Sequence, residues 1–380
     1  MTQAAHVGFG SERHLAAALD ALAPHSILLL TGRTSFSASG AEDAVGHRLS
    51  GRRVHRLSHA GGPPQVEGVR QGIAEFRSFR PDVVVAVGGG SVLDMAKLVA
   101  LLAVQPGAPA ALTEYVTGDR PIERDACPLI ALPTTAGSGS EATHFAVVYH
   151  DKRKYSVAHA SVLPRVAIVD PQFTMTLTPR QTAISGFDAL SQAVESYWSV
   201  NSTDVSRERS RRAVGLALEH LSAAVRRPTR AARAGMAEAA FLAGQAIDIA
   251  RTTAPHAVSY GMTAWFDVPH GQAVAVTLPH FFRFNAATTP EDTTDRRGAA
   301  FVRQTIGELN EMLGARSAEE SCARLQALMR EVGLATTLES LGISSAESRQ
   351  RILEGVNPER MINNPRAVTS GQLQEIVANA

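Results

Sequence analysis

The segment from Asp82 to Lys97 constrains this chain more than any other part of its sequence. It reads Asp-Val-Val-Val-Ala-Val-Gly-Gly-Gly-Ser-Val-Leu-Asp-Met-Ala-Lys, so a run of mostly β-branched residues ends in three glycines before a helical pattern begins. This order predicts a buried strand that turns directly into a helix. Bare backbone N–H groups at a helix N-terminus bind phosphate groups. We therefore expect a nucleotide pyrophosphate here, with a purely connecting glycine turn as the alternative.

The spacing leaves the identity of the nucleotide open. It is neither the dinucleotide pattern G-x-G-x-x-G nor a P-loop, which would end in Gly-Lys-Ser or Gly-Lys-Thr.

The bulk properties of the chain restrict its class. A length of 380 residues predicts two domains, and a net charge of +1 with neutral histidines argues against a nucleic-acid partner or a basic membrane patch. Two cysteines, Cys127 and Cys322, imply no disulfide framework and fit a reducing compartment. No signal peptide or membrane-spanning run stands out. We expect a soluble, cytoplasmic protein.

The first half of the chain alternates short apolar runs with amphipathic stretches, as a parallel α/β sheet requires. Residues 145–149 and 155–158 read as a hairpin added to that sheet. From about Thr178 the strand signal disappears and long Ala- and Leu-rich stretches follow, such as 206–225 and 231–250. The expected strands are 26–30, 53–57, 83–87, 129–132 and 166–170, and the expected helices are 12–22, 66–79 and 91–102.

We therefore expect two domains. Residues 1–178 would form an α/β dinucleotide-binding domain, a parallel sheet with helices on both faces. Residues 179–380 would form an all-helical domain for metal and substrate.

The second half contains candidate metal ligands. Asp188 and Gln192 are four residues apart on a predicted helix and point to one side of it. Fourteen residues of continuous helix would separate His256 from His270 by about 21 Å, but Pro269 and Gly271 are helix breakers that allow the chain to turn. One carboxylate, one amide and two imidazoles suit Fe²⁺ or Zn²⁺ rather than Mg²⁺ or Ca²⁺. Taken singly, a histidine is more often a surface or hydrogen-bonded core residue than a ligand.

Five segments together resemble the iron-containing (group III) alcohol dehydrogenase family across nearly the whole chain. They are Gly88-Gly-Gly-Ser91-x-x-Asp94-x-x-Lys97, Pro133-Thr-Thr-Ala-Gly-Ser-Gly-Ser-Glu-Ala-Thr143, Gly186-x-Asp188-Ala-Leu, Pro269-His270-Gly271 and Asn364-Pro365-Arg366. The resemblance implies a dehydroquinate-synthase-like fold with a nucleotide-binding domain and a helical metal-binding domain. It also implies hydride transfer between a nicotinamide and a carbonyl held by a divalent metal, which would act as a Lewis acid.

The resemblance and the local sequence together give a set of cofactor residues. The hydroxyl-rich loop after the strand at 129–132 is suited to wrap a ribose, phosphate or nicotinamide; a loop of no function is the alternative. Lys154 matches a family position that faces the cofactor ribose, although a lone lysine in a turn is often only solvated. The set comprises Gly89, Gly90, Ser91, Asp94, Thr134, Thr135, Ser138, Ser140 and Lys154.

Two positions depart from the family pattern. Gln192 stands where the family usually has a histidine, and an amide oxygen is a weaker donor than imidazole. The site therefore holds its metal less tightly or uses three protein ligands and solvent. Tyr260 stands where a further histidine is common; its phenol either relays a proton to the substrate oxygen or packs. We count Asp188, His256, His270 and Tyr260 as the catalytic set.

The end of the strand at 26–30 bears on the choice of cofactor. NAD-dependent dehydrogenases usually place a carboxylate there to bind the ribose 2′-hydroxyl. This chain has Gly32 followed by Arg33, which removes repulsion of a 2′-phosphate and offers a cation to bind it. We expect NADP(H) in preference to NAD(H), with a merely solvated Arg33 as the alternative.

Three residues just before His256 indicate the substrate: Arg251, Thr252 and Thr253. Members of the family usually have small, apolar residues at these positions. One arginine and two threonines suit a tetrahedral oxyanion. The segments around Asp188 and Arg251 resemble the phosphonoacetaldehyde reductase (2-hydroxyethylphosphonate dehydrogenase) branch. This implies a phosphonate-bearing aldehyde; alternatively, Arg251 pairs with a structural carboxylate.

Rival functions are a general short-chain alcohol dehydrogenase of the same family, a dehydroquinate-synthase-like lyase, and a noncatalytic metal- or nucleotide-binding protein. The lyase would need more Lys, Arg and Glu around its substrate than this chain shows. We expect a small aldehyde or alcohol as the partner, and a homodimer.

Overall fold

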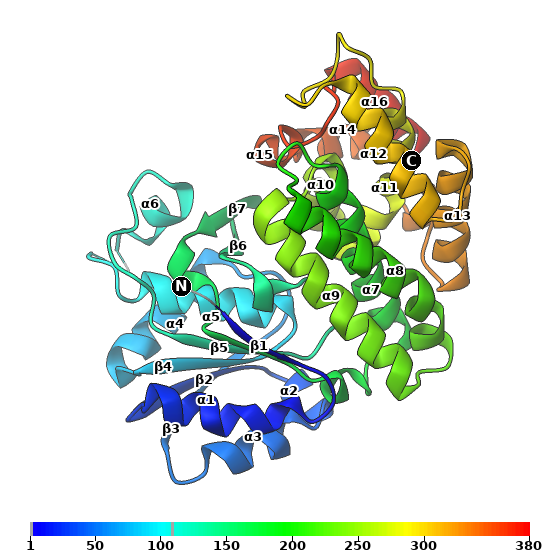
Figure 1. Ribbon diagram of the computed structural model, residues 1–380. Coiled ribbons are helices and arrows are strands. Elements are labelled where there is room, and N and C mark those ends of the chain that lie inside the picture. The colour runs from blue at the N-terminus through cyan, green and yellow to red at the C-terminus, as the bar shows by residue number, and fades with distance from the viewer. Residues whose placement is uncertain (1–2, 108–109) are drawn as a thin grey trace. The chain divides into compact units, whose positions relative to one another are not determined.

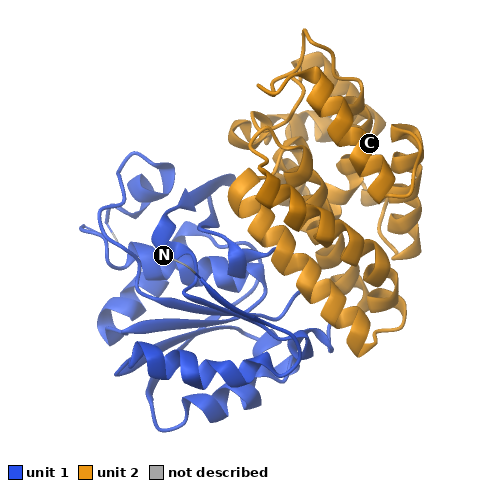
Figure 2. Cartoon of the chain, viewed as in Figure 1, with its two compact units in different colours: residues 1–177 blue, residues 178–380 orange. Residues whose placement is uncertain are grey.

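The computed structural model describes residues 3–107 and 110–380, and the chain divides into two compact units between Leu177 and Thr178 (Figure 2). Among the described residues of the first unit, six parallel strands form one sheet in the order β1-β8-β5-β4-β2-β3. The strands are β1 (Ala4–Val7), β2 (Ser26–Gly32), β3 (Arg53–His59), β4 (Val83–Gly88), β5 (Leu129–Pro133) and β8 (Val166–Val169).

Helices cover both faces of this sheet, which confirms the expected α/β fold class (Figure 1). Successive side chains of a strand point to opposite faces, so Ile27 and Leu29 pack on one side while Leu28 and Leu30 pack on the other. The first side is covered by α1 (His14–Leu22), α2 (Ser35–Ala38) and α3 (Ala41–Leu49), and the second by α4 (Val66–Phe79), α5 (Gly90–Leu102) and α6 (Leu112–Thr117).

The hairpin forms, but it is not added to the main sheet as we expected. Strands β6 (Phe145–His150) and β7 (Arg153–Ala158) make a separate antiparallel pair. Its other backbone pairing joins Tyr149 to the segment that precedes α4, through Tyr149 N–H and the Pro64 carbonyl at 2.8 Å. Asp151 and Lys152 close the turn with φ values of 48° and 61°.

The strand order places the predicted cofactor residues at one edge of the sheet. Strand β3 lies on one side of β2 and β4 lies on the other side. The next strand, β5, continues outward beyond β4, so the direction in which strands are added reverses between β3 and β4. Ligands bind outside the carboxyl ends of parallel strands where the order reverses in this way. Gly32 ends β2 and Gly88 ends β4, so both lie at this reversal.

Among its described residues the second unit has helices and no strand, with one isolated backbone bridge between Thr293 and Arg366, which confirms the expected all-α character of that half. Thr178 begins it as the N-cap of α7 in a capping box with Gln181. The helices are α7 (Pro179–Trp198), α8 (Asp204–Arg226), α9 (Arg230–Ala250), α10 (Ala254–Phe266), α11 (His270–Ala286), α12 (Ala299–Met312), α13 (Ala318–Glu331), α14 (Ala346–Glu354), α15 (Pro358–Met361) and α16 (Ser370–Asn379). None of the helices in the described part of the chain has the length and apolar character needed to span a membrane.

Candidate active site

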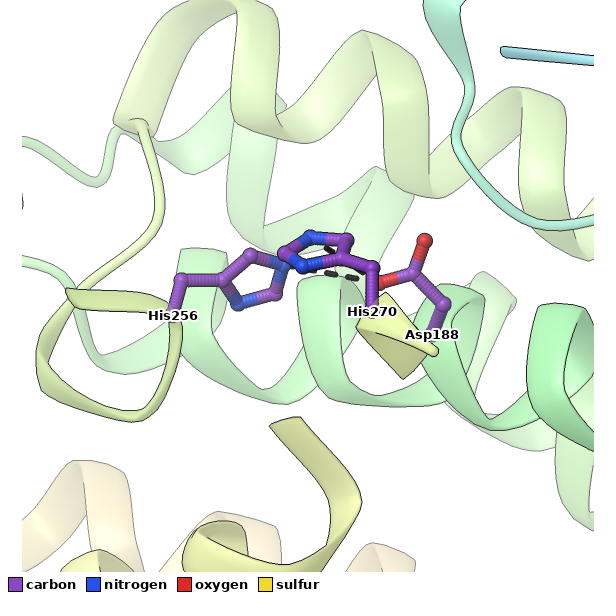
Figure 3. Close-up of side chains that lie close together, drawn as sticks. All are labelled: Asp188, His256 and His270. Atoms are coloured by element: carbon purple, nitrogen blue, oxygen red, sulfur yellow. Dashed lines mark ion pairs between the residues drawn. The ribbon is translucent and has the colours of Figure 1, made fainter. Parts of the chain in front are cut away.

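Asp188, His256 and His270 come together in the second unit from three different helices. Each offers one ligand atom, and these atoms lie within 4.8 Å of one another. Oδ1 of Asp188 lies 3.5 Å from Nε2 of His256 and 4.0 Å from Nε2 of His270, and Figure 3 shows the carboxylate and both rings turned toward one another. The two ring planes meet at 72°, so their nitrogens approach a common point from different directions.

The break between α10 and α11 brings His270 back beside His256. Helix α10 ends at Phe266, Asp267 adopts a left-handed conformation with φ 52°, and Pro269 is the N-cap of α11. We expected Gly271 to break the helix as well, but it is the second residue of α11. Its lack of a side chain serves packing instead, because a methyl group there would lie 2.1 Å from the carbonyl oxygen of Ile184 on α7.

The three groups fit a divalent cation. Nε2 of His256 is buried and, among the described residues, has no hydrogen-bond partner. Burial alone lowers the pKa of His256, but the Glu195 and Asp188 carboxylates outweigh it and raise this pKa to about 9. A buried position between carboxylates that favours a proton this strongly also favours a cation, and the oxygen and imidazole donors suit Fe²⁺ or Zn²⁺.

Gln192 contacts this group through Asp188. Its Nε2 donates to Oδ2 of Asp188 at 3.2 Å, one helical turn away on α7, and the side chain is buried. Gln192 therefore lies beside the ligand carboxylate, where it either ligates through Oε1 or orients Asp188.

Sequence reasoning missed Glu195, which is fully buried on the same face of α7. Its carboxylate accepts a hydrogen bond from Nδ1 of His256, and also from the backbone N–H (2.7 Å) and hydroxyl (3.0 Å) of Thr253. With Nδ1 donating, Nε2 of His256 keeps its lone pair for a metal. A signal existed, since Asp188, Gln192 and Glu195 follow the i, i+4, i+7 spacing of one helix face.

Tyr260 lies on α10 one turn after His256 and stacks on His270, with ring centroids 5.8 Å apart and planes at 15°. Burial raises the pKa of its phenol, while side-chain hydrogen bonds with Arg360 and Thr252 act in the opposite direction. Arg360 is itself buried, in α15, and sequence reasoning did not single it out.

Arg251 follows α9 with a backbone φ of 63°, a conformation that L-residues other than Asn and Asp rarely adopt. Burial lowers the pKa of its guanidinium, the nearby like charge of Arg360 lowers it further, and Asp248 opposes both. The guanidinium of Arg251 thus interacts electrostatically with a second guanidinium as well as with one carboxylate.

Thr252 and Thr253 have different surroundings, although we expected either to hold substrate. The Thr252 side chain contacts Tyr260. The Thr253 hydroxyl is fully buried, donates to Glu195 and accepts from Nε1 of Trp198 at 2.8 Å. Its only proton is therefore used internally, which indicates a positioning part, and a contact of Thr253 with substrate stays a prediction.

In the first unit, the glycine turn packs against the predicted hydroxyl loop. Gly89 is the N-cap of α5 with extended backbone, and none of the three glycines has a positive φ. They are needed for close approach: a methyl group on Gly90 would lie 2.5 Å from Oγ of Ser138, and one on Gly89 would lie 3.3 Å from Cγ2 of Thr135. Ser91, Thr135 and Ser138 are half-buried at this turn, and Oγ1 of Thr134 is buried without a hydrogen-bond partner among the described residues.

Asp94 and Ser140 hold this loop together. Oδ1 of Asp94 accepts from the Ser140 hydroxyl at 2.6 Å, and Oδ2 accepts from the Val147 N–H at 3.1 Å. Burial raises the pKa of Asp94, and the positive charges of Lys97 and Lys154 are among the influences that oppose this rise. Lys97 is fully buried and donates to Thr143 and Phe145. Asp94 and Ser140 thus have a structural part, and their contact with a cofactor stays a prediction.

At the end of β2, Gly32 is buried and Arg33 is exposed. A methyl group on Gly32 would lie 2.1 Å from Oγ of Ser35. The turn is anchored by the Arg33 N–H, which donates to the His59 carbonyl at 3.0 Å, and this leaves the Arg33 side chain in solvent at the carboxyl edge of the sheet.

Comparison with known proteins decides the family. Residues 3–171 match the family model of iron-containing alcohol dehydrogenases, and residues 182–380 match the model of that family's C-terminal domain. The chain belongs to the iron-containing alcohol dehydrogenase family. It is therefore an oxidoreductase of a family that uses NAD(P) and a divalent metal. This family assignment argues against the lyase and the noncatalytic alternatives.

Individual relatives within the family act on different substrates. The chain is 34% identical to the phosphonoacetaldehyde reductase of Streptomyces viridochromogenes over 83% of its own length and 80% of the relative's. It is 33% identical to long-chain-alcohol dehydrogenase 1 of Geobacillus thermodenitrificans over 94% and 89%. Among solved structures, the sulfoacetaldehyde reductase of Bifidobacterium kashiwanohense in complex with NAD⁺ superposes with a TM-score of 0.85 at 27% identity, covering 99% of this chain and 96% of that one.

Proposed function

We propose that this dehydrogenase reduces a small aldehyde bearing a phosphonate, phosphonoacetaldehyde, to the primary alcohol 2-hydroxyethylphosphonate with NADPH. Asp188, His256 and His270 would hold a single Fe²⁺ or Zn²⁺, with Gln192 at or beside a fourth position. Bound there, the metal would supply Lewis acidity at the aldehyde oxygen, and the nicotinamide would supply the hydride.

The observation that carries the substrate proposal is that the like charge of Arg360 lowers the pKa of Arg251, while Arg360 and Thr252 both hydrogen-bond with Tyr260. An anion with two negative charges would relieve the repulsion between these two guanidinium groups. Tyr260, which stacks on the metal ligand His270, would place the aldehyde end of a two-carbon substrate within reach of this anion site.

Tyr260 also has a suitable state for the chemistry. Because burial raises the pKa of its phenol, the hydroxyl keeps its proton at neutral pH. The hydroxyl can then donate that proton to the alkoxide oxygen that forms as hydride reaches the carbonyl carbon.

The test is Arg251→Ala, with Arg251→Lys as the matched variant that keeps the charge but not the bidentate geometry. Loss of a charged hydrogen bond of about 3 kcal/mol predicts a fall in kcat/KM for phosphonoacetaldehyde of about 10²-fold or more. Activity on propanal should barely change. Equal losses on both aldehydes would make Arg251 structural and remove the support for the phosphonate.

A second candidate is a general alcohol dehydrogenase, favoured by the similar identity to the long-chain enzyme. A wild-type panel of phosphonoacetaldehyde, sulfoacetaldehyde and propanal separates the candidates. Our proposal requires the doubly charged phosphonate to have the highest kcat/KM, since two guanidinium groups favour it over a singly charged sulfonate.

A further inference from the structure

The carboxylate of Glu195, on α7, bonds to two neighbouring parts of the active site, the turn that precedes α10 and the first turn of α10 itself. One oxygen, Oε1, accepts from Nδ1 of the metal ligand His256. The other, Oε2, accepts from the backbone N–H of Thr253 at 2.7 Å and from its hydroxyl at 3.0 Å. Glu195 and Thr253 are completely buried and His256 nearly so, which leaves water no place in these bonds.

The segment that Glu195 holds is the turn that carries Arg251. Arg251 has a φ of 63°, a conformation that costs free energy and persists only when neighbouring contacts impose it. Such contacts surround the turn. The hydroxyl of Ser199 donates to the Ala250 carbonyl at 2.6 Å, and Nδ2 of Asn363 donates to the Thr252 carbonyl at 2.9 Å. Nε1 of Trp198 and the Glu195 carboxylate then fix Thr253.

We propose that Glu195 is a positioning residue that sets the metal ligand His256 and the anion-binding turn Arg251–Thr253 at the same time. Its Oε1 fixes the His256 ring and keeps Nε2 available for the metal. Its Oε2 anchors the turn, so the guanidinium stays directed toward the substrate's anionic group. The part of this inference that concerns Arg251 rests on the proposed function, whereas the part that concerns His256 needs only the family's metal.

A carboxylate is needed because three donors converge on Glu195: the His256 ring N–H, the Thr253 backbone N–H and the Thr253 hydroxyl. A glutamine of the same shape has one acceptor oxygen and presents its own donors to the other side. One of the two connections must then break, and a buried donor is left unsatisfied or the His256 ring turns. The carboxylates that orient metal-bound histidines in this way typically contribute 10- to 100-fold in metal affinity.

The test uses Glu195→Gln in the full chain, stripped of metal and titrated with Zn²⁺ against a chelator and with Co²⁺ followed by its visible spectrum. We expect the affinity for Zn²⁺ to fall 10- to 100-fold and the Co²⁺ spectrum to change. The rise in Tm on adding Zn²⁺ should shrink, while the Tm of the metal-free protein changes less. If Zn²⁺ affinity and spectrum match those of the wild type, the proposal is wrong. An equal fall in Tm with and without Zn²⁺ would show a merely structural role and overturn it as well.

Two variants separate the two connections. Thr253→Val removes the hydroxyl but keeps the backbone N–H that Glu195 accepts and the bond between Glu195 and His256. The affinity for Zn²⁺ should therefore stay within about threefold of the wild type. The KM for phosphonoacetaldehyde should rise more than the KM for propanal. Ser196→Ala, a buried change on α7 whose hydroxyl bonds Ser210 outside the site, controls for disturbance of the helix and should leave the Zn²⁺ affinity, the Co²⁺ spectrum and both KM values unchanged.

Two further results decide the remaining cases. If Glu195→Gln does not fold without metal, Glu195→Asp takes its place with the same expectations, and failure of both to fold makes the residue structural and overturns the proposal. If wild-type enzyme ignores phosphonoacetaldehyde, the proposed substrate is wrong, but the Zn²⁺ titration still decides whether Glu195 positions His256.

Discussion

Gly271 on α11 and Ile184 on α7 approach so closely that a methyl group on the glycine would lie 2.1 Å from the isoleucine's carbonyl oxygen. The same methyl group would lie 3.0 Å from Cβ of Asp188. Because backbone cannot rotate away as a side chain can, only glycine permits this approach. The approach places His270, the preceding residue, beside Asp188. The packing of two helices and the geometry of the candidate metal site therefore depend on one missing side chain.

We expect Gly271→Ala to weaken the metal site without touching a ligand. Helix α11 must move away from α7, which separates His270 from Asp188 and overpacks the core at a cost of about 1–3 kcal/mol. Metal content after purification should fall toward that of His270→Ala, which removes the ligand itself. Elemental analysis and thermal unfolding measure the two effects.

The matched control is Gly307→Ala, because Gly307 lies inside α12 and a methyl group there would meet nothing within 4 Å. It should retain full metal content and gain up to about 1 kcal/mol from helix propensity. Wild-type metal content in Gly271→Ala would show that α11 accommodates the methyl group, and our account of this contact would be wrong.

Arg33 gives a prediction about the cofactor. If its exposed guanidinium binds a 2′-phosphate at the end of β2, Arg33→Ala should lower kcat/KM for NADPH about tenfold or more, the scale of one charged hydrogen bond, and leave NADH nearly unchanged. Arg33 is a better target than Gly32, because an aspartate at Gly32 would first have to displace Ser35. Arg180→Ala, an exposed arginine at the start of α7, is the control. A wild-type preference for NADH would contradict the prediction.

Most strands of the sheet could be predicted from the sequence because they are buried and strongly apolar. Helix α4 was predicted to the residue, since Val66, Val69, Ile73 and Phe76 repeat along one face. Strand β1 was missed because it is four residues long and mostly exposed, with no alternation to read. The hairpin strands were found but their place was not, because pairing with a sheet depends on neighbours that are distant in sequence.

The grouping of Asp188, His256 and His270 was predictable because family spacing and helix periodicity agree on these three residues. The sequence placed Glu195 only as a third member of the same helix face. The neighbouring residues do not distinguish a buried carboxylate that accepts hydrogen bonds from a solvated one. Arg360 lies over a hundred residues from Arg251 in the chain, and only the folded structure, in which α15 packs against α10, shows that its charge acts on Arg251. The sequence could not show that Thr253 bonds to Trp198 and Glu195, because both partners come from another helix.

Glu141 supplies the last prediction, on pH and stability. It lies in the short helix Ser140–Ala142 after β5 and is 2% exposed. Burial raises the pKa of its carboxyl to about 7, against the opposing effects of its own backbone hydrogen bond and of Lys97. In the unfolded chain this carboxyl ionises near pH 4.5, whereas in the folded protein it stays protonated until about pH 7.

Folding therefore binds a proton in that range, and the contribution of Glu141 to stability is highest below pH 4.5 and is lost progressively as the pH rises to about 7. A shift of this size corresponds to about 3 kcal/mol. We expect the free energy of unfolding of wild type, measured by urea denaturation, to fall by that amount relative to Glu141→Gln between pH 4.5 and 7.5, and the difference to be constant outside it. The exposed Glu291→Gln, made in the same way, reports what removal of one negative charge does by itself. A wild-type curve that runs parallel to the Glu141→Gln curve throughout would mean that Glu141 ionises at the same pH in the folded and unfolded chain. In that case the loop after β5 admits water to this carboxyl.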